Sequence, residues 1–223
     1  MRTTLAAILL PVFLAGCSVA GIRDGYEEPA FEVTDRLGDA AEVRRYAPRL
    51  AAEVTVPSND SDEGRNAAFR LLFDYISGAN RSEADIAMTV PVETAGGGQE
   101  IAMTAPVETE SLASDQLRMR FFLPSAFNSE NAPRPTDQRV RLVEVPAETF
   151  AVLRFSGSTG AAAVQTRTEE LMALLAGSSW RAAAMPIAYF YDPPWTLPPF
   201  RRNEVAIAVE KDPTQGPEST AGG

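Results

Sequence analysis

The sequence predicts an α+β fold in which a largely antiparallel sheet carries two helices. Three observations support it. Short β-rich segments separated by turn residues run through most of the chain, and two longer segments have helical periodicity instead. The order strands–helix–strands occurs twice, which predicts an internal duplication with pseudo-twofold symmetry. No flexible linker separates the halves, so we expect one domain.

The first helix is predicted between two local signals. Asp60 and Glu63 have the spacing of a capping box at its start, and Gly78 supplies the stop. Between them, apolar residues recur at i, i+3, i+4 and i+7, at Phe69, Leu72, Phe73 and Ile76. The second helix has Val164, Leu171, Met172 and Leu175 on one face and ends at Gly177. Each helix is apolar on a single side, so each is expected to cover a sheet.

The remaining β-rich segments predict the strands. They are Phe31–Val33, Glu42–Arg44, Ala52–Val56, Ile86–Val92, Ile101–Val107, Leu117–Leu123, Val140–Val145, Phe150–Phe155, Ala188–Tyr191 and Glu204–Val209. Two of them belong to a local repeat, because residues 86–94 recur almost unchanged as residues 101–109. A Gly triplet at 96–98 lies between the copies, which favours a hairpin.

Residues 1–16 are interpreted as a lipoprotein signal peptide. Arg2 is followed by an apolar run, Leu5–Leu14, that is too short to cross a bilayer as a helix. Leu14-Ala15-Gly16-Cys17 resembles the bacterial lipobox, which implies a diacylglycerol on Cys17. The alternative is an ordinary secretory signal with an incidental cysteine. We expect a lipid-anchored protein of the cell envelope, and Ser18 favours the outer membrane, facing the periplasm.

Three further segments follow from composition. Residues 17–30 are polar with scattered Gly and Pro and are expected to form a lipidated tether. Residues 31–210 contain all the predicted elements and form the globular domain. Residues 211–223 contain two Pro and three Gly and are expected to be a disordered tail.

Charge and residue counts exclude several functions. The formal charge of −10 argues against a nucleic-acid partner, because phosphate contacts need a basic surface. The chain has no His, so it has no Ser-His-Asp triad and no His metal ligand. Its single Cys cannot form an internal disulfide framework. We therefore expect no metal site built from protein side chains.

Five motifs in a fixed order resemble the SOUL family of haem-binding proteins. They are Val43-Arg44-Arg45-Tyr46, Met103-Thr104-Ala105-Pro106-Val107, Phe121-Phe122-Leu123-Pro124, Tyr191-Asp192-Pro193-Pro194-Trp195 and Arg201-Arg202-Asn203-Glu204-Val205. The resemblance covers about Phe31 to Glu210. It implies an internally duplicated, distorted antiparallel β-barrel with two flanking helices. It also implies reversible binding of haem or another tetrapyrrole in a shallow apolar groove beside the first helix.

That groove would draw its residues from the first helix. Phe69, Leu72 and Phe73 could form the apolar wall, and Arg65 and Arg70 could pair with the haem propionates. The alternative is that the apolar residues pack on the sheet and the arginines form a solvated face.

Few side chains of the chain are candidates for an axial ligand to haem iron. The candidates are Met88, Met103 and Tyr191, and Tyr75 is a further possibility. A Met in an apolar strand is, however, more often part of the hydrophobic core. We therefore expect haem to bind without His ligation, by burial of the ring. Trp195 is expected to close one end of the barrel, with ligand contact as the alternative. Arg201, Arg202 and Glu204 open the last strand, where a buried Arg–Glu pair would specify the fold.

The sequence thus predicts a non-catalytic carrier, buffer or sensor of haem or tetrapyrrole, anchored to the membrane by lipid. The alternative is a cofactor-free envelope interaction module built on the same barrel, with an unknown protein partner. An enzyme would require carboxylates such as Glu93 and Glu108 to converge, and these are expected to be exposed strand ends instead.

Overall fold

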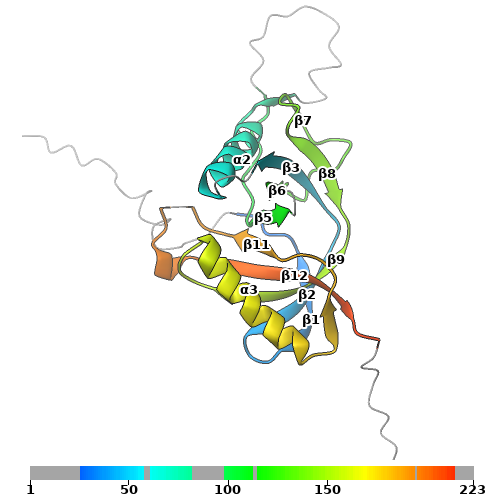
Figure 1. Cartoon of the computed structure of the whole chain (residues 1–223). Helices are drawn as coiled ribbons and strands as arrows, with labels where there is room; N and C mark the ends of the chain where they lie inside the picture. The colour runs from blue at the N-terminus through cyan, green and yellow to red at the C-terminus, as the bar shows by residue number, and fades with distance from the viewer. Residues whose placement is uncertain (1–25, 58–60, 82–97, 113–114, 194, 214–223) are drawn as a thin grey trace, which may run out of the picture.

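The computed structural model describes residues 26–57, 61–81, 98–112, 115–193 and 195–213. Within these ranges, two α-helices accompany the strands (Figure 1). In chain order the elements are β1 (Phe31–Leu37), β2 (Ala41–Tyr46), β3 (Arg49–Pro57), α2 (Ser61–Ile76), β4 (Asn80–Arg81), β5 (Val107–Leu112), β6 (Gln116–Phe122), β7 (Arg134–Pro135), β8 (Arg141–Val145), β9 (Glu148–Phe155), α3 (Ala161–Ala176), β10 (Trp180–Ala182), β11 (Ile187–Phe190), the 3-10 turn η2 (Pro198–Phe200) and β12 (Asn203–Lys211).

One curled antiparallel sheet dominates the described residues. Its strand order is β1-β2-β9-β12-β11-β5-β6-β3-β8, with β10 added beside β12. The predicted α+β distorted barrel with two helices is therefore confirmed. The short pair β4-β7 forms a separate two-stranded sheet.

The strand order is symmetric about the β5–β11 pair, as the predicted duplication requires. Each half has the order strand, strand, helix, strand, strand, and β2-β3-α2-β5-β6 corresponds to β8-β9-α3-β11-β12. The first strand of each half pairs with the other half, because β2 lies against β9 and β8 lies against β3. The two halves have therefore exchanged a strand, which ties them into one unit.

The first predicted helix is α2, and it ends before Gly78, whose φ of 112° lies in the left-handed region. Asp60 of the predicted capping box lies outside the described residues. The second is α3, whose C-cap is Gly177. Leu171 and Leu175 are buried as expected, but Met172 is 44% exposed. Adjacent residues lie about 100° apart on a helix, and this rotation turns Met172 away from the core that buries Leu171.

Both helices pack on the same face of the curled sheet, and the other face is enclosed within it. Alternate strand residues point to opposite faces. Val205 and Ile207 therefore join the cluster under α3, while Ala206 joins the inner cluster with Phe122 and Tyr189. The cluster under α2 contains Leu72. Figure 1 shows α3 lying across β12 and β9.

The structure corrects the strand that was predicted in the second copy of the repeat. Its first copy, residues 86–94, lies outside the described residues, so the hairpin is not described. The strand predicted at Ile101–Val107 begins only at Val107 and continues to Leu112. Pro106 has no N–H to donate to a sheet, which explains why β5 starts after it. β5 then pairs with β6 and β11.

At the two ends, packed structure extends beyond the predicted domain limits. Tyr26, Glu27 and Glu28 fall in the predicted tether, yet Glu27 bridges to Thr104 and Glu28 pairs with Arg202 at 2.9 Å. Lys211 of the predicted tail belongs to β12. Residues 1–25, including Cys17, and residues 214–223 lie outside the described residues. Among the described helices, none is long and apolar enough to cross a bilayer.

Candidate functional site

A cavity of about 710 Å³ opens beside α2. Its walls come from α2, from the start of β5 with the segment before it, and from β11 with the loop that follows. Of the predicted groove and ligand residues, the structure brings five to this cavity: its lining includes Arg65, Phe69, Phe73, Met103 and Tyr191. Met88 lies outside the described residues.

One stripe along α2 faces the cavity. It contains Asp62, Arg65, Asn66, Phe69 and Phe73. These positions recur at three- or four-residue intervals, the spacing of one helix face. The rings of Phe69 and Phe73 stack with centroids 6.0 Å apart and planes 13° apart, so they form a flat apolar wall.

The other two predicted groove residues lie elsewhere. Leu72 is fully buried in the core under α2 and does not line the cavity, because it projects about 100° away from Phe73. Arg70 lies exposed on the helix, where its Nε donates to the carbonyl of Asn66 at 3.4 Å. The apolar periodicity of α2 therefore contains two faces, one for the core and one for the cavity.

Arg65 bridges the two halves of the molecule. Its Nη1 donates to the carbonyl of Thr159 at 3.0 Å, and its Nη2 pairs with Asp62. Thr159 lies in the loop before α3 and also lines the cavity. The guanidinium is thus held at the rim, and its side chain is 25% exposed.

The floor of the cavity is largely apolar. It is formed by Met103 and Val107 of the second repeat copy and by Met119 of β6. Thr109 lies among them, and its Oγ1 is buried without a hydrogen-bond partner in the described part of the chain. A buried hydroxyl without a partner is unfavourable, so a ligand or water that bonds to it would gain affinity. Sequence reasoning missed Thr109, although its i+2 spacing from Val107 places it on the same strand face.

The end of β11 and the loop that follows it form the outer wall. Phe190, Asp192, Pro193 and Trp195 contribute to it. Trp195 is 64% exposed, so the prediction that it closes an end of the barrel is wrong. The charged residues of this wall are Asp192 and, from the end of the loop, Arg201, whose Nε donates to the carbonyl of Thr196 at 2.8 Å.

Tyr191 lines the cavity, but its side chain packs in the inner cluster, where its hydroxyl is engaged. The hydroxyl donates to Glu204 Oε2 at 2.7 Å, and the Arg202 guanidinium lies 3.7 Å from the ring centroid. Burial, followed by the nearby Glu204 carboxylate, raises the pKa of the Tyr191 phenol. A tyrosinate ligand for iron would have to lose this proton and this hydrogen bond.

The Arg–Glu pair expected at the start of the last strand forms between Arg202 and Glu204, with 3.1 Å between Arg202 Nη2 and Glu204 Oε1. Glu204 is fully buried and also accepts from Arg44 at 3.0 Å. Two arginines and one tyrosine therefore surround this carboxylate. Such compensation is what permits a carboxylate to be buried at all.

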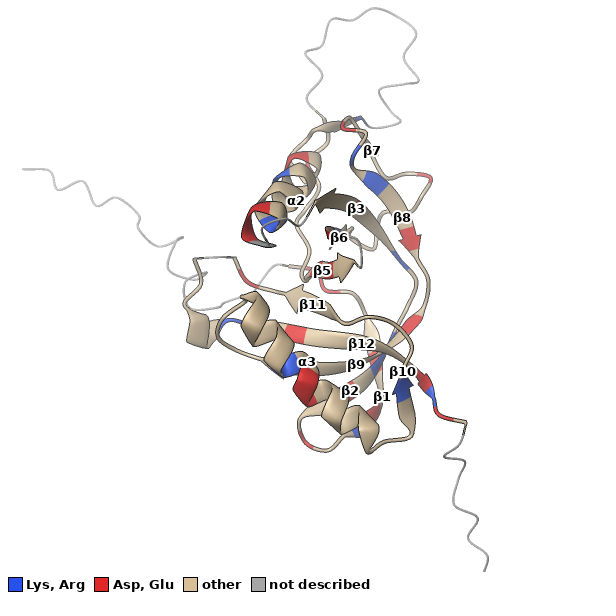
Figure 2. Cartoon of the chain, viewed as in Figure 1, with Lys and Arg blue, Asp and Glu red and all other residues tan. Residues whose placement is uncertain are grey.

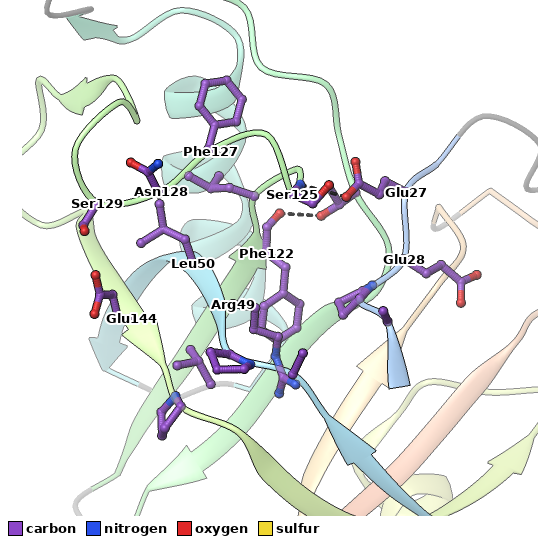
Figure 3. Close-up of a pocket in the computed structure, with 18 residues that line it drawn as sticks. Glu27, Glu28, Arg49, Leu50, Phe122, Ser125, Phe127, Asn128, Ser129 and Glu144 are labelled. Carbon is purple, nitrogen blue, oxygen red and sulfur yellow. Dashed lines mark hydrogen bonds between the residues drawn. The ribbon is translucent and has the colours of Figure 1, made fainter. Parts of the chain in front are cut away.

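A second cavity of about 700 Å³ lies between the β2–β3 turn, the segment after β6 and the segment before β1 (Figure 3). Figure 3 shows Glu27, Glu28 and Glu144 around it, and the Glu27 carboxylate accepts from the Ser125 N–H at 2.7 Å. Arg49 contributes the one guanidinium in its described lining. This excess of carboxylates makes it a poorer site for an acidic tetrapyrrole than the cavity beside α2.

The carboxylates considered for an enzyme do not form a described active site. Glu93 lies outside the described residues. Glu108 is buried, at 2% exposure, and pairs with Arg120 at 2.9 Å, so it is not the exposed strand end that the sequence suggested. Within the described ranges, no three His, Cys, Asp or Glu side chains converge as a metal site would require.

Comparison with known proteins identifies relatives over most of the chain. The family model described as SOUL heme-binding protein matches residues 26–208. Heme-binding protein 1 of Sus scrofa is 29% identical over 155 residues, covering 69% of this chain and 76% of that protein. Heme-binding protein 1 of Mus musculus is 30% identical over 158 residues, with the same 69% and 76% coverage.

Solved structures with the same fold are more distant in sequence. The EcmrR C-terminal domain superposes with a TM-score of 0.56 at 12% identity, covering 77% of this chain and 97% of that domain. An uncharacterized conserved protein from Listeria innocua gives a TM-score of 0.53 at 11% identity, covering 77% and 92%. At such low identity these similarities concern the fold alone.

Proposed function

The chain belongs to the SOUL heme-binding protein family, and from this membership we propose that it binds haem or a related tetrapyrrole in the cavity beside α2. The observation that carries the proposal is the stacked Phe69–Phe73 wall, which faces a largely apolar floor across a cavity of about 710 Å³. Cavities that hold small molecules and cofactors measure roughly 300–1,000 Å³ and are mostly apolar with a few polar groups.

The polar groups of this cavity suit an acidic, flat ligand. Arg65 and Arg201 are the cationic side chains in its described lining, and guanidinium groups bind carboxylates in a bidentate geometry. Arg65 pairs with the Asp62 carboxylate, and Asp192 also belongs to the cavity lining. A ligand carboxylate would therefore compete with Asp62 for Arg65, which favours reversible binding.

Ring burial would supply most of the affinity. The chain has no His, and the hydroxyl of Tyr191 is committed to Glu204. Met103 and Met119 both contribute thioethers to the described cavity lining, and Met103, the one predicted from the sequence, remains the candidate axial ligand. We propose weak ligation or none, and a non-catalytic role as carrier, buffer or sensor.

The cellular setting is part of the proposal. The lipobox-like Leu14-Ala15-Gly16-Cys17 supports cleavage before Cys17 and acylation of its sulfur. We propose that the protein is anchored in the cell envelope, in the outer membrane and facing the periplasm. Mass spectrometry of the mature N-terminus tests this, and an unmodified Cys17 would contradict it.

Titration with hemin, followed by the Soret band, tests ligand binding. Phe73→Asp should weaken binding roughly 10- to 100-fold, because it removes an apolar ring of the kind whose burial contributes about 1.5–3 kcal/mol. Met172→Asp is the matched control, since Met172 is 44% exposed on α3 and Phe73 is 45% exposed on α2. Met172→Asp should leave the titration unchanged.

Two results would contradict the proposal. A Soret shift that weakens equally in both variants would show binding without a specific groove. The lack of any shift in the unaltered chain would favour the alternative, a cofactor-free envelope interaction module.

A further inference from the structure

Exposed apolar side chains gather around the mouth of the cavity. Among the described residues, nine large apolar side chains are exposed, and three of them, Tyr26, Phe73 and Trp195, line the cavity. Leu197 and Phe200, 49% and 53% exposed, belong to the same loop as Trp195. An apolar patch of this kind on a soluble domain marks an interaction surface.

The loop that carries this patch has no charge along its length. Between Asp192 and Arg201 the sequence contains only apolar residues, prolines and Thr196. The η2 turn lies between β11 and β12, and Figure 2 accordingly draws it in tan, without blue or red. Trp combines an apolar ring with a polar N–H, which suits it to the boundary between lipid and water.

The chain enters the described structure at this same mouth. Tyr26 is the first described residue and lines the cavity. Cys17, the proposed acylation site, lies nine residues earlier. Nine residues span at most about 30 Å even when fully extended, at roughly 3.3–3.6 Å per residue. An acyl anchor on Cys17 therefore holds the mouth close to the bilayer that it enters.

We propose that the loop carrying Trp195, Leu197 and Phe200 docks onto the lipid bilayer and turns the mouth of the cavity toward it. This rests on the proposed acylation of Cys17. The short tether supplies proximity, and the apolar loop supplies orientation. The tetrapyrrole could then pass between bilayer and cavity with little exposure of its apolar ring to water.

The chain offers its own pair of probes, because it contains two Trp. Trp195 lies on the proposed docking loop. Trp180 lies on β10, where its indole N–H donates to Asp35 at 2.8 Å and Lys211 lies 4.0 Å from its ring. Trp180→Phe leaves Trp195 as the single fluorophore, and Trp195→Phe leaves Trp180 as the matched control.

The acylated full-length mature protein is reconstituted into phosphatidylethanolamine–phosphatidylcholine vesicles whose acyl chains carry bromine, a contact quencher of Trp. The Trp180→Phe protein should show a blue shift and several-fold stronger quenching than the Trp195→Phe protein. Adding Leu197→Ser and Phe200→Ser to Trp180→Phe should abolish most of that quenching, with far-UV circular dichroism unchanged.

Equal, weak quenching of both single-Trp proteins on vesicles that carry the protein would overturn the docking alone. A protein that does not float with vesicles would overturn the anchor and the docking together. Hemin binding is read separately at the Soret band, so its failure would leave the quenching result standing.

Discussion

Two tyrosines that lie two residues apart differ in the hydrogen bonding of their hydroxyls. Tyr191 donates to the buried Glu204 carboxylate at 2.7 Å. Tyr189 is 1% exposed, and its hydroxyl has no hydrogen-bond partner among the residues that the structure describes. In both cases burial, as the largest cause, raises the phenol pKa. The two hydroxyls should therefore contribute differently to stability.

Replacement of each tyrosine by phenylalanine tests this difference. Tyr191→Phe should lower the free energy of unfolding by about 1–3 kcal/mol, because it leaves buried Glu204 with one donor fewer. Tyr189→Phe should be neutral or stabilising, because it removes a buried polar group that has no partner. Urea unfolding midpoints at constant m-value measure both. Equal losses in the two variants would contradict the assignment.

Adjacent residues on one helix can serve different surfaces, and only packing decides between them. The apolar positions of α2 predicted a helix correctly, yet Leu72 belongs to the core and Phe73 to the cavity. Both are large and apolar, so composition gives no means of separating them. The same ambiguity put Met172 on the buried face of α3, where the structure has it 44% exposed.

At the scale of elements, the end of α2 is locked to the segment that leads into β5. Gly98 lies so close to the turn after α2 that a Cβ on it would overlap the Gly78 carbonyl oxygen. The buried Asn80 side chain then bonds both backbone groups of Gln99, donating to its carbonyl at 2.8 Å and accepting from its N–H at 2.9 Å. This contact positions the segment that carries Met103 into the cavity.

Substitution of Gly98 tests this close approach between the turn after α2 and the segment before β5. Gly98→Ala should cost about 1–3 kcal/mol of stability, because the added methyl meets backbone atoms and not a flexible side chain. Gly177→Ala is the control, since its nearest contact is Leu174 O at 3.9 Å and its φ is −97°. That change should stay within about 0.5 kcal/mol. Comparable thermal shifts for the two variants would argue against a specific close approach.

At the scale of the whole molecule, the exchanged strands couple the two halves. β2 and β8 each pair with the half to which they do not belong in sequence, and β5 and β11 join the halves directly. Neither half can lose its sheet without exposing edges and core of the other. Unfolding should therefore be a single cooperative transition.

Matched core substitutions in the two halves test this cooperativity. Leu72→Ala under α2 and Leu171→Ala under α3 each remove a fully buried side chain and should each cost about 2–5 kcal/mol. In both variants, Trp fluorescence and far-UV circular dichroism should still report one coincident midpoint. Two separated transitions in either variant would mean that the halves fold independently.

Periodicity, glycine stops and motif order determined the fold class, both helices, most strands, the duplication and the family resemblance. These features depend on local sequence, because the periodicity of helices and strands and the glycines that end helices act within a few residues. A buried Arg–Glu pair among Arg201, Arg202 and Glu204 was also predicted, since these residues are close in sequence, and the structure forms it between Arg202 and Glu204.

The tertiary structure decided which of these residues meet. It separated Leu72 from Phe73, brought Trp195 to the mouth of the cavity and exposed it, and committed the Tyr191 hydroxyl to Glu204. It also brought Thr109 into the cavity, although the sequence identified this residue only as the last position of the second repeat copy. Each outcome depends on contacts between segments far apart in the chain, and the pattern along one segment does not encode what the neighbouring segment presents to it.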